Sequence, residues 1–226
     1  MSPKPSRSKT KSLHPRLRSG RSLATAFAFL ALAALTLLAA VTAAAGTTAK
    51  PRVTVIGDSI MASFDYVPSA RRALGRGLDL RSNTAVCRRL VAASCPFQGS
   101  TPSTALDVVA ASGRGLGRVV VMNVGYNDWV AVYDVDRMMR ALRRAGVRTA
   151  IWVTLREASS NASLYAQSNA RIRTAARRWR SSLVVADWNA YSRGRPWFRE
   201  DGLHLTSSGA MGLAQLLRPL VVDAST

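Results

Sequence analysis

Hydrophobic residues occur along this chain first as one long run and then as short runs separated by polar stretches. The long run covers residues 23–45 and contains no charged side chain. The later runs are continuous and rich in β-branched residues, which is typical of strands that are buried on both faces. They predict strands at 52–56, 118–124, 147–155 and 183–187, and a weaker run predicts a short strand at 78–81.

Helical patterns alternate with these strands and predict helices at 69–74, 104–116, 134–145, 163–180 and 207–217. Asp134 suits the N-cap of one helix and Gly146 the position just after its end. Thr206 or Ser207 caps the last helix, which should end before Pro219. The alternation predicts an α/β domain with a mainly parallel sheet that is covered on both faces, so a site is expected beyond the carboxyl ends of the strands.

The N-terminal part has the layout of an export signal. Residues 1–21 hold seven basic side chains and no acidic one, residues 23–45 are apolar, and small residues at 43–46 resemble a cleavage site. A run of this length also spans a bilayer, so an uncleaved anchor remains an alternative. Either way the basic flank stays inside, and residues 46–226 are predicted to lie outside the cytoplasm, secreted or anchored to the outer face of the membrane. No arginine pair precedes the run, which favours Sec export over Tat.

The composition excludes several classes of function. Residues 22–226 carry 25 basic and 12 acidic side chains. Export argues against a nucleic-acid partner for this charge, so an anionic envelope polymer or membrane surface is expected, or else a solvated arginine-rich surface without a partner. Lys50 is the only lysine after Lys11, which argues against pyridoxal phosphate enzymes and P-loop NTPases. Two cysteines are too few for a zinc site of several thiolates, and no metal or cofactor is expected.

Cys87 and Cys95 both lie in the exported part. An even pair in an oxidising compartment predicts a disulfide, and two free buried thiols are the alternative.

Three short motifs follow predicted strands. Gly57-Asp58-Ser59 comes directly after 52–56, where a serine on a tight turn presents its hydroxyl and its N–H at the sheet edge. Gly125-Tyr126-Asn127-Asp128 comes directly after strand 118–124, and Asn127 offers an amide donor to the same place. Each motif alone is also an ordinary turn sequence.

The third motif, Asp201-Gly-Leu-His204, follows strand 183–187 and a loop, and it holds the only histidine beyond His14. An aspartate three residues before a histidine can orient the ring so that the other ring nitrogen takes a proton from a serine. Alternatively, Asp201 only caps the next helix. Glu200 is a possible substitute as orienting acid, whereas Asp58 lacks this spacing.

Together the motifs resemble blocks I, III and V of the SGNH/GDSL hydrolases, of the secreted bacterial type, over roughly residues 53–220. The resemblance implies a flavodoxin-like three-layer α/β/α sandwich at 52–226 after a linker at 46–51. It also implies ester cleavage through an acyl-serine. Ser59 would be the nucleophile, His204 the base and Asp201 its orienting acid, with Ser59 N–H and the Asn127 side chain in the oxyanion hole.

One block departs from the family pattern. Block II normally supplies a glycine whose N–H is a further oxyanion donor, but residues 82–89 contain none. Cys87 takes that place, and Gly99 is a distant second candidate. A backbone N–H does not require glycine, so Cys87 is expected to donate, with a disulfide to Cys95 holding the loop.

The sequence therefore predicts an extracytoplasmic serine esterase or lipase acting on small acyl esters, lipids or O-acetylated glycans. The alternatives are a cell-envelope O-acyltransferase with the same triad and a non-catalytic envelope-binding domain. Aromatic side chains near the motifs either line a cleft or pack in the core; these are Tyr126, Trp129, Trp188 and Trp197.

Overall fold

Five parallel strands form the centre of the structure, a computed structural model that describes residues 49–226. The strands are β1 (Arg52–Gly57), β2 (Asp79–Thr84), β3 (Val119–Asn123), β4 (Thr149–Val153) and β5 (Leu183–Ala186). They lie in the order β2-β1-β3-β4-β5, and every neighbouring pair is parallel. This is the flavodoxin-like order, so the predicted fold class is confirmed. All five strands end at one edge of the sheet, where the motifs were expected.

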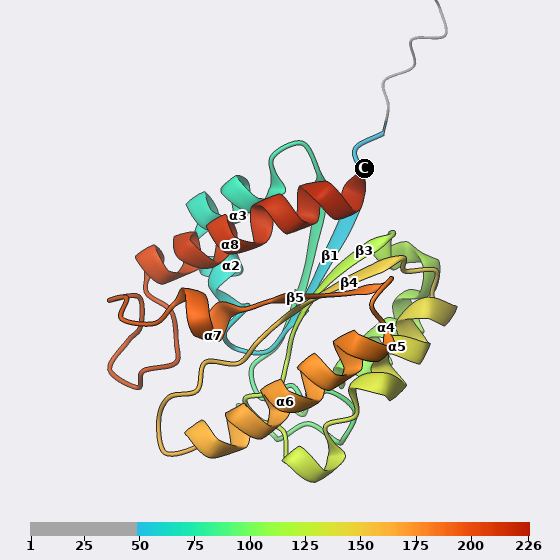
Figure 1. Cartoon of the computed structure of the whole chain (residues 1–226). Coiled ribbons are helices and arrows are strands. Elements are labelled where there is room, and N and C mark those ends of the chain that lie inside the picture. Colours follow the sequence, from blue (N-terminus) through green and yellow to red (C-terminus); the bar gives the residue numbers. More distant parts are fainter. Residues whose placement is uncertain (1–48) are drawn as a thin grey trace, which may run out of the picture. The chain divides into compact units, whose positions relative to one another are not determined.

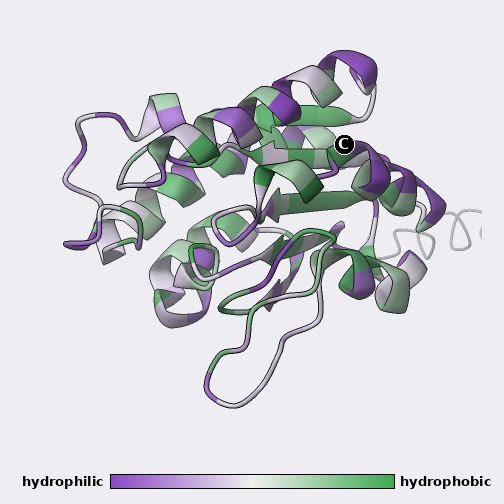
Figure 2. Cartoon of the chain, turned by 90° about the horizontal axis from the view of Figure 1, so that it is seen from below, coloured by the Kyte–Doolittle hydropathy of each residue, from purple (hydrophilic) through white to green (hydrophobic). Residues whose placement is uncertain are grey.

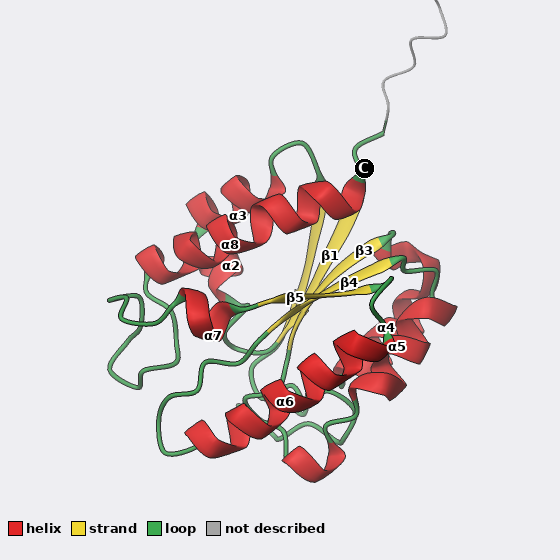
Figure 3. Cartoon of the chain, in the orientation of Figure 1, coloured by secondary structure: helices red, strands yellow, loops and turns green. Residues whose placement is uncertain are grey.

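Helices cover both faces of the sheet (Figure 1). One layer contains α2 (Ser63–Tyr66), α3 (Pro68–Gly75) and α8 (Ser207–Ser225). The other contains α4 (Ala105–Ser112), α5 (Val135–Arg144) and α6 (Ala162–Arg178), and Figure 3 shows the strands between the two layers. The short α7 (Trp188–Tyr191) and the 3₁₀ turns η1 (Gly113–Leu116) and η2 (Val130–Val132) complete the elements.

Two apolar clusters hold these layers together, one on each face of the sheet. Figure 2 shows the hydrophobic strands inside and the polar faces of the helices outside. Val120 and Met122 of β3 pack on one side, and Val119 and Val121 on the other. Because alternate side chains of a strand point to opposite faces, a continuous apolar strand serves both clusters.

Several predicted element ends are refined by the structure. β2 is longer than the predicted 78–81, because its polar residues pair with all of β1 at the edge of the sheet. β4 is shorter than 147–155, since Leu155 N–H donates to the Asn169 side chain rather than to a strand. The predicted helix 104–116 is α4 followed by η1. The helices α2 and α7 were not predicted.

The prediction that the last helix ends before Pro219 is wrong, because α8 continues to Ser225. Proline leaves the carbonyl of Gln215 without its helical partner, but Gln215 and Pro219 are both exposed, so water can bond that carbonyl. Burial of Leu217 and Val221 on either side of Pro219 holds the helix against the sheet. Thr206, rather than Ser207, caps it and accepts the Gly209 N–H.

The predicted signal or anchor at 1–45 lies outside the described residues. Within residues 49–226 no helix is both long and apolar enough to cross a membrane.

Candidate active site

Ser59 lies in the tight turn that follows β1. The turn begins where Asp58 N–H donates to Asn123 O at 3.1 Å, which ties it to the end of β3. Gly57 is required just before it, because a Cβ there would collide with the Met61 side chain. The turn thus places Ser59 at the carboxyl edge of the sheet.

His204 and Asp201 reach Ser59 from the loop before α8. Ser59 Oγ lies 3.0 Å from His204 Nε2, and His204 Nδ1 lies 2.6 Å from Asp201 Oδ2. These distances are those of a hydrogen-bonded serine, histidine and carboxylate in series. The structure therefore brings together three side chains that lie up to 145 positions apart in the sequence.

Local hydrogen bonds set the position of Asp201. Its Oδ1 accepts the N–H groups of Leu203 at 2.8 Å and His204 at 2.9 Å, so the carboxylate caps its own loop. Burial acts to raise the pKa of Asp201, but the Leu203 N–H, the His204 ring and the His204 N–H outweigh it and lower that pKa to about 2. Asp201 is therefore a carboxylate at neutral pH, the form that holds the imidazole in one orientation.

Arg156 supports the loop from the end of β4. Its guanidinium donates to Gly202 O and lies 3.5 Å above the Phe198 ring. Its backbone N–H donates to the Tyr126 hydroxyl. Sequence reasoning missed this residue, since no motif contains it.

Asn127 lies in the turn after β3. Its Nδ2 donates to Arg88 O at 3.3 Å, and its backbone carbonyl accepts from Arg89 Nε at 2.7 Å. The amide nitrogen carries two hydrogens, so one remains for another acceptor. The structure thus ties Asn127 to the loop that follows β2.

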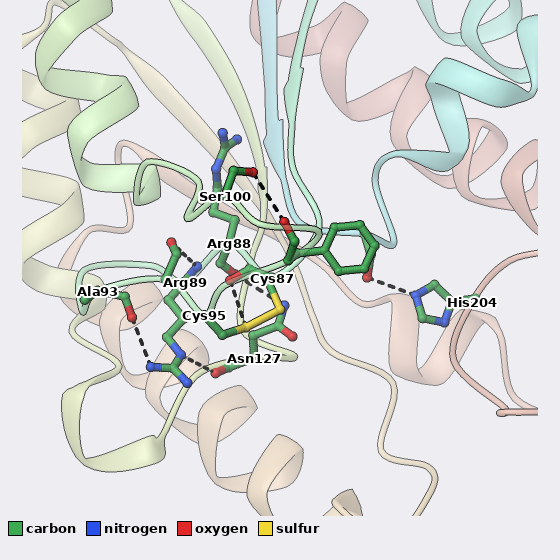
Figure 4. Close-up of a disulfide and its surroundings, with 11 residues drawn as sticks. Cys87, Arg88, Arg89, Ala93, Cys95, Ser100, Asn127 and His204 are labelled. Atoms are coloured by element: carbon green, nitrogen blue, oxygen red, sulfur yellow. Dashed lines mark hydrogen bonds between the residues drawn. A yellow bond between two sulfur atoms is a disulfide. The ribbon is translucent and has the colours of Figure 1, made fainter.

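Cys87 lies in that loop and has a φ of 65°, the left-handed region that favours glycine. It forms a disulfide with Cys95, which Figure 4 shows. The Cys95 N–H also donates to Cys87 O at 3.2 Å. The expected pairing is therefore present, and Cys87 has the backbone conformation of a glycine. Gly99 instead lies in a separate turn between Phe97 and Ser100. Within residues 49–226, neither Ser59 N–H nor Cys87 N–H donates to a protein acceptor.

Two buried aspartates beside the motifs connect the three turns. Asp58 accepts the N–H groups of Ile60 and Tyr126, and Asp128 accepts Leu90 N–H with both oxygens. Burial raises the pKa of Asp58 to about 6 and that of Asp128 to about 7, against the opposing effect of these N–H donors. Asp58 belongs to the first sequence motif and Asp128 to the second, but only the structure shows these bonds.

The four aromatic candidates divide between core and surface. Trp188 is fully buried, and half-buried Trp197 stacks on it at 5.7 Å. Tyr126 supports Arg156 through its hydroxyl. Trp129 is 61% exposed, with the Arg89 guanidinium 3.9 Å over its ring. Glu200 is exposed, and the ring of His204 is bonded by Asp201 instead.

Among the residues that the structure describes, no group of three His, Cys, Asp or Glu side chains is placed to hold a metal ion.

No protein-family model matches the sequence, and no curated protein matches it. Solved structures do match the fold. The C-terminal catalytic domain of peptidoglycan O-acetyltransferase A from Streptococcus pneumoniae, solved with a methylsulfonyl adduct, has a TM-score of 0.58 at 18% identity, over 78% of this chain and 95% of that one. A lipolytic protein of the G-D-S-L family from Veillonella parvula has a TM-score of 0.54 at 14% identity, over 76% and 98%. This protein has the fold of the SGNH/GDSL hydrolases.

A family two carbohydrate esterase from Cellvibrio japonicus also shares this SGNH/GDSL fold, with a TM-score of 0.53 at 15% identity, over 78% of this chain and 62% of that one. At these identities the likeness is one of fold. It agrees with the resemblance that the three sequence blocks carry.

Proposed function

We propose that this protein is an extracytoplasmic serine esterase that cleaves carboxylic esters through an acyl-serine intermediate. The observation that carries the proposal is the hydrogen-bonded series from Ser59 Oγ through His204 to Asp201. Serine, histidine and carboxylate at these distances form a nucleophile, a general base and the group that orients the base.

In the first step Ser59 Oγ attacks the carbonyl carbon of the ester, and His204 Nε2 takes the serine proton. The carbonyl oxygen becomes an oxyanion. Its donors in the proposal are Ser59 N–H, Cys87 N–H and the free hydrogen of the Asn127 amide. The C–O bond to the alcohol then breaks, and His204 returns the proton to the leaving alkoxide.

In the second step water attacks the acyl-serine while His204 takes a proton from the water. The bond from the acyl carbon to Ser59 Oγ then breaks, His204 returns the proton to Ser59 Oγ, and the carboxylic acid leaves. A sugar hydroxyl in place of water would make the same site an acyltransferase. The likeness to a peptidoglycan O-acetyltransferase domain favours this as the second candidate. The two reactions differ only in the acceptor, so they share every residue named above.

The openness of the site favours short acyl groups. The side chains of His204 and Asp201 are 41% and 47% exposed. An exposed site offers little apolar surface to a long acyl chain, which gains affinity by burial. We therefore expect acetyl esters, free or on a glycan, to be better substrates than octanoyl esters. The disulfide supports the predicted oxidising location outside the cytoplasm, and an anionic envelope or membrane surface remains the proposed partner of the basic exterior.

Turnover of p-nitrophenyl acetate, butyrate and octanoate tests the proposal. Residues 49–226 form a compact unit, so the protein is produced from residue 46 onward. Expression in an oxidising compartment allows the disulfide to form. Wild type should release p-nitrophenol, and Ser59→Ala should not. Ser181→Ala is a matched control, because Ser181 is an exposed serine just before β5, at the other end of the strands.

A sulfonyl fluoride should add one sulfonyl group to wild type and none to Ser59→Ala, as detected by mass spectrometry. A folded wild type without turnover on any ester refutes the esterase proposal. Acetyl transfer to a glycan acceptor without hydrolysis would identify the second candidate instead.

A further inference from the structure

Arg88, which directly follows Cys87, is the only buried basic side chain among the described residues, at 4% exposure. Its guanidinium donates to three backbone carbonyls. Nη1 lies 2.6 Å from Asn83 O and 3.3 Å from Gly57 O, and Nε lies 3.0 Å from Ser103 O. None of these acceptors is a carboxylate. Burial lowers the pKa of Arg88 and the charge of Asp58 acts against that, but no carboxylate in the described part of the chain accepts a hydrogen bond from the guanidinium. The three carbonyls are therefore what fixes its position.

The carbonyls belong to three different segments around the proposed oxyanion site. Gly57 ends β1 and begins the turn that carries Ser59. Asn83 belongs to β2, just before the Cys87 loop, and Ser103 precedes α4. The guanidinium therefore connects the turn that carries Ser59 to the loop that carries Cys87.

The backbone of Arg88 completes the connection. The Arg88 carbonyl accepts a hydrogen bond from Asn127 Nδ2 at 3.3 Å, so Arg88 also orients the side-chain amide of Asn127. Figure 4 shows Arg88, the Cys87–Cys95 disulfide and Asn127 together, with His204 approaching from the other side. Within residues 49–226, Arg88 is thus the one residue that bonds to the segments of all three proposed donors.

Arginine suits this position better than lysine. Its planar guanidinium carries five N–H donors in a fixed fork and can reach carbonyls that point in different directions. A lysine ammonium places its three donors on one atom. Replacing arginine by lysine therefore keeps the charge but loses at least one of the three connections.

We propose that Arg88 is a positioning residue that aligns Cys87 N–H and the Asn127 amide with Ser59 N–H on one oxyanion. The inference rests on the proposed function. Because the aligned donors bond the oxyanion rather than the ground-state ester, loss of Arg88 should lower kcat and leave KM nearly unchanged. Misalignment of one donor lowers the rate by about 10²-fold.

The test compares Arg88→Lys and Arg88→Gln with wild type on p-nitrophenyl acetate. Turnover is expressed per serine labelled by the sulfonyl fluoride, so that only folded protein counts. Inhibition by an alkyl trifluoromethyl ketone, whose adduct with serine carries an oxyanion, is measured beside it. Arg218→Lys is the matched control, since Arg218 donates to the Leu74 carbonyl between α8 and α3.

We expect kcat to fall about 10²-fold, KM to stay within about 3-fold, and the inhibition constant of the ketone to rise in parallel with the loss of kcat/KM. Arg218→Lys should keep wild-type kinetics. A lower melting temperature with unchanged turnover per labelled serine would mean that Arg88 is only structural and would overturn the inference. So would a rise in KM at constant kcat. A wild type that turns over no ester refutes the proposed function itself, and with it this inference.

Discussion

The disulfide at Cys87 can be separated from the backbone conformation that it accompanies. Two double variants make the separation: Cys87→Ser with Cys95→Ser, and Cys87→Gly with Cys95→Ser. Both remove the cross-link. Only the second puts at position 87 a residue that adopts a φ of 65° without steric cost.

The expected stabilities follow from loop length and conformation. The disulfide closes a loop with a sequence separation of 8, which corresponds to about 2.5 kcal/mol on the chain-entropy model. A left-handed conformation costs a residue other than glycine about 1 kcal/mol. The Cys87→Ser double variant should therefore lose about 2.5 kcal/mol, and the Cys87→Gly double variant should recover about 1 kcal/mol of it. For a domain of this size these losses correspond to melting temperatures lower by about 5–10 °C and 3–6 °C.

The expected rates differ more clearly than the stabilities. Without the disulfide, a serine at position 87 would relax toward negative φ and turn its N–H away from the oxyanion, so kcat should fall about 10²-fold. Glycine keeps the left-handed conformation available and should retain most of the rate. The assay is p-nitrophenyl acetate turnover per labelled serine, with thermal melts of the same samples. Mild reduction of wild type should reproduce the Cys87→Ser double variant.

Two results would refute this reasoning. Full activity in the Cys87→Ser double variant would mean that Cys87 N–H does not stabilise the oxyanion. An equal loss of rate in the two double variants would mean that the cross-link, and not the φ angle, decides the activity. Titration of two free thiols in the native protein would show that Cys87 and Cys95 form no disulfide, and the comparison of the two variants would then lose its basis.

Other predictions concern the triad loop and buried charge. Asp201→Ala should lower kcat by about 10⁴-fold and still leave turnover above the Ser59→Ala background, because the base and the oxyanion donors remain; equal backgrounds would contradict this. Arg156→Met removes the support of Gly202 O, and steady-state kinetics should show a kcat about 10- to 100-fold lower, whereas wild-type kcat would exclude that support. Burial raises the pKa of Asp58 to about 6 and that of Asp128 to about 7, above the unfolded value of about 4. The folded state then holds more protons than the unfolded state between about pH 4 and about pH 7, so the free energy of unfolding should fall as the pH rises through that range. Urea titrations of Asp58→Asn and Asp128→Asn should show a flatter slope over this range than wild type, and unchanged slopes would refute the assignment.

Local pattern was sufficient for the strands and for most helices. β3 and its neighbour β1 are continuous apolar runs because both faces of a parallel sheet are buried, and that requirement is visible in any single segment. Asp134 and Thr206 cap helices by accepting the N–H group three residues further on, which is also a local property. The edge strand β2 was predicted too short. It pairs with one strand only and is partly exposed, so its residues are mostly polar and lack the apolar pattern of a buried strand.

Pro219 marks the limit of local rules. A proline normally ends a helix, but here exposure of the affected carbonyl and burial of Val221 allow α8 to continue. Neither exposure nor burial at that position can be known before the helix is packed on the sheet.

The sequence by itself determined which residues could carry chemistry. A serine after the first strand, an asparagine after the third and an Asp-x-x-His pair after the fifth were placed at one edge by the parallel topology alone. Only the tertiary structure decided their contacts: the 3.0 Å approach of Ser59 to His204, and the left-handed backbone of Cys87. It also revealed Arg88, whose partners are backbone carbonyls. Every residue carries a carbonyl, so no sequence pattern can tell which of them a guanidinium will meet until the chain has folded.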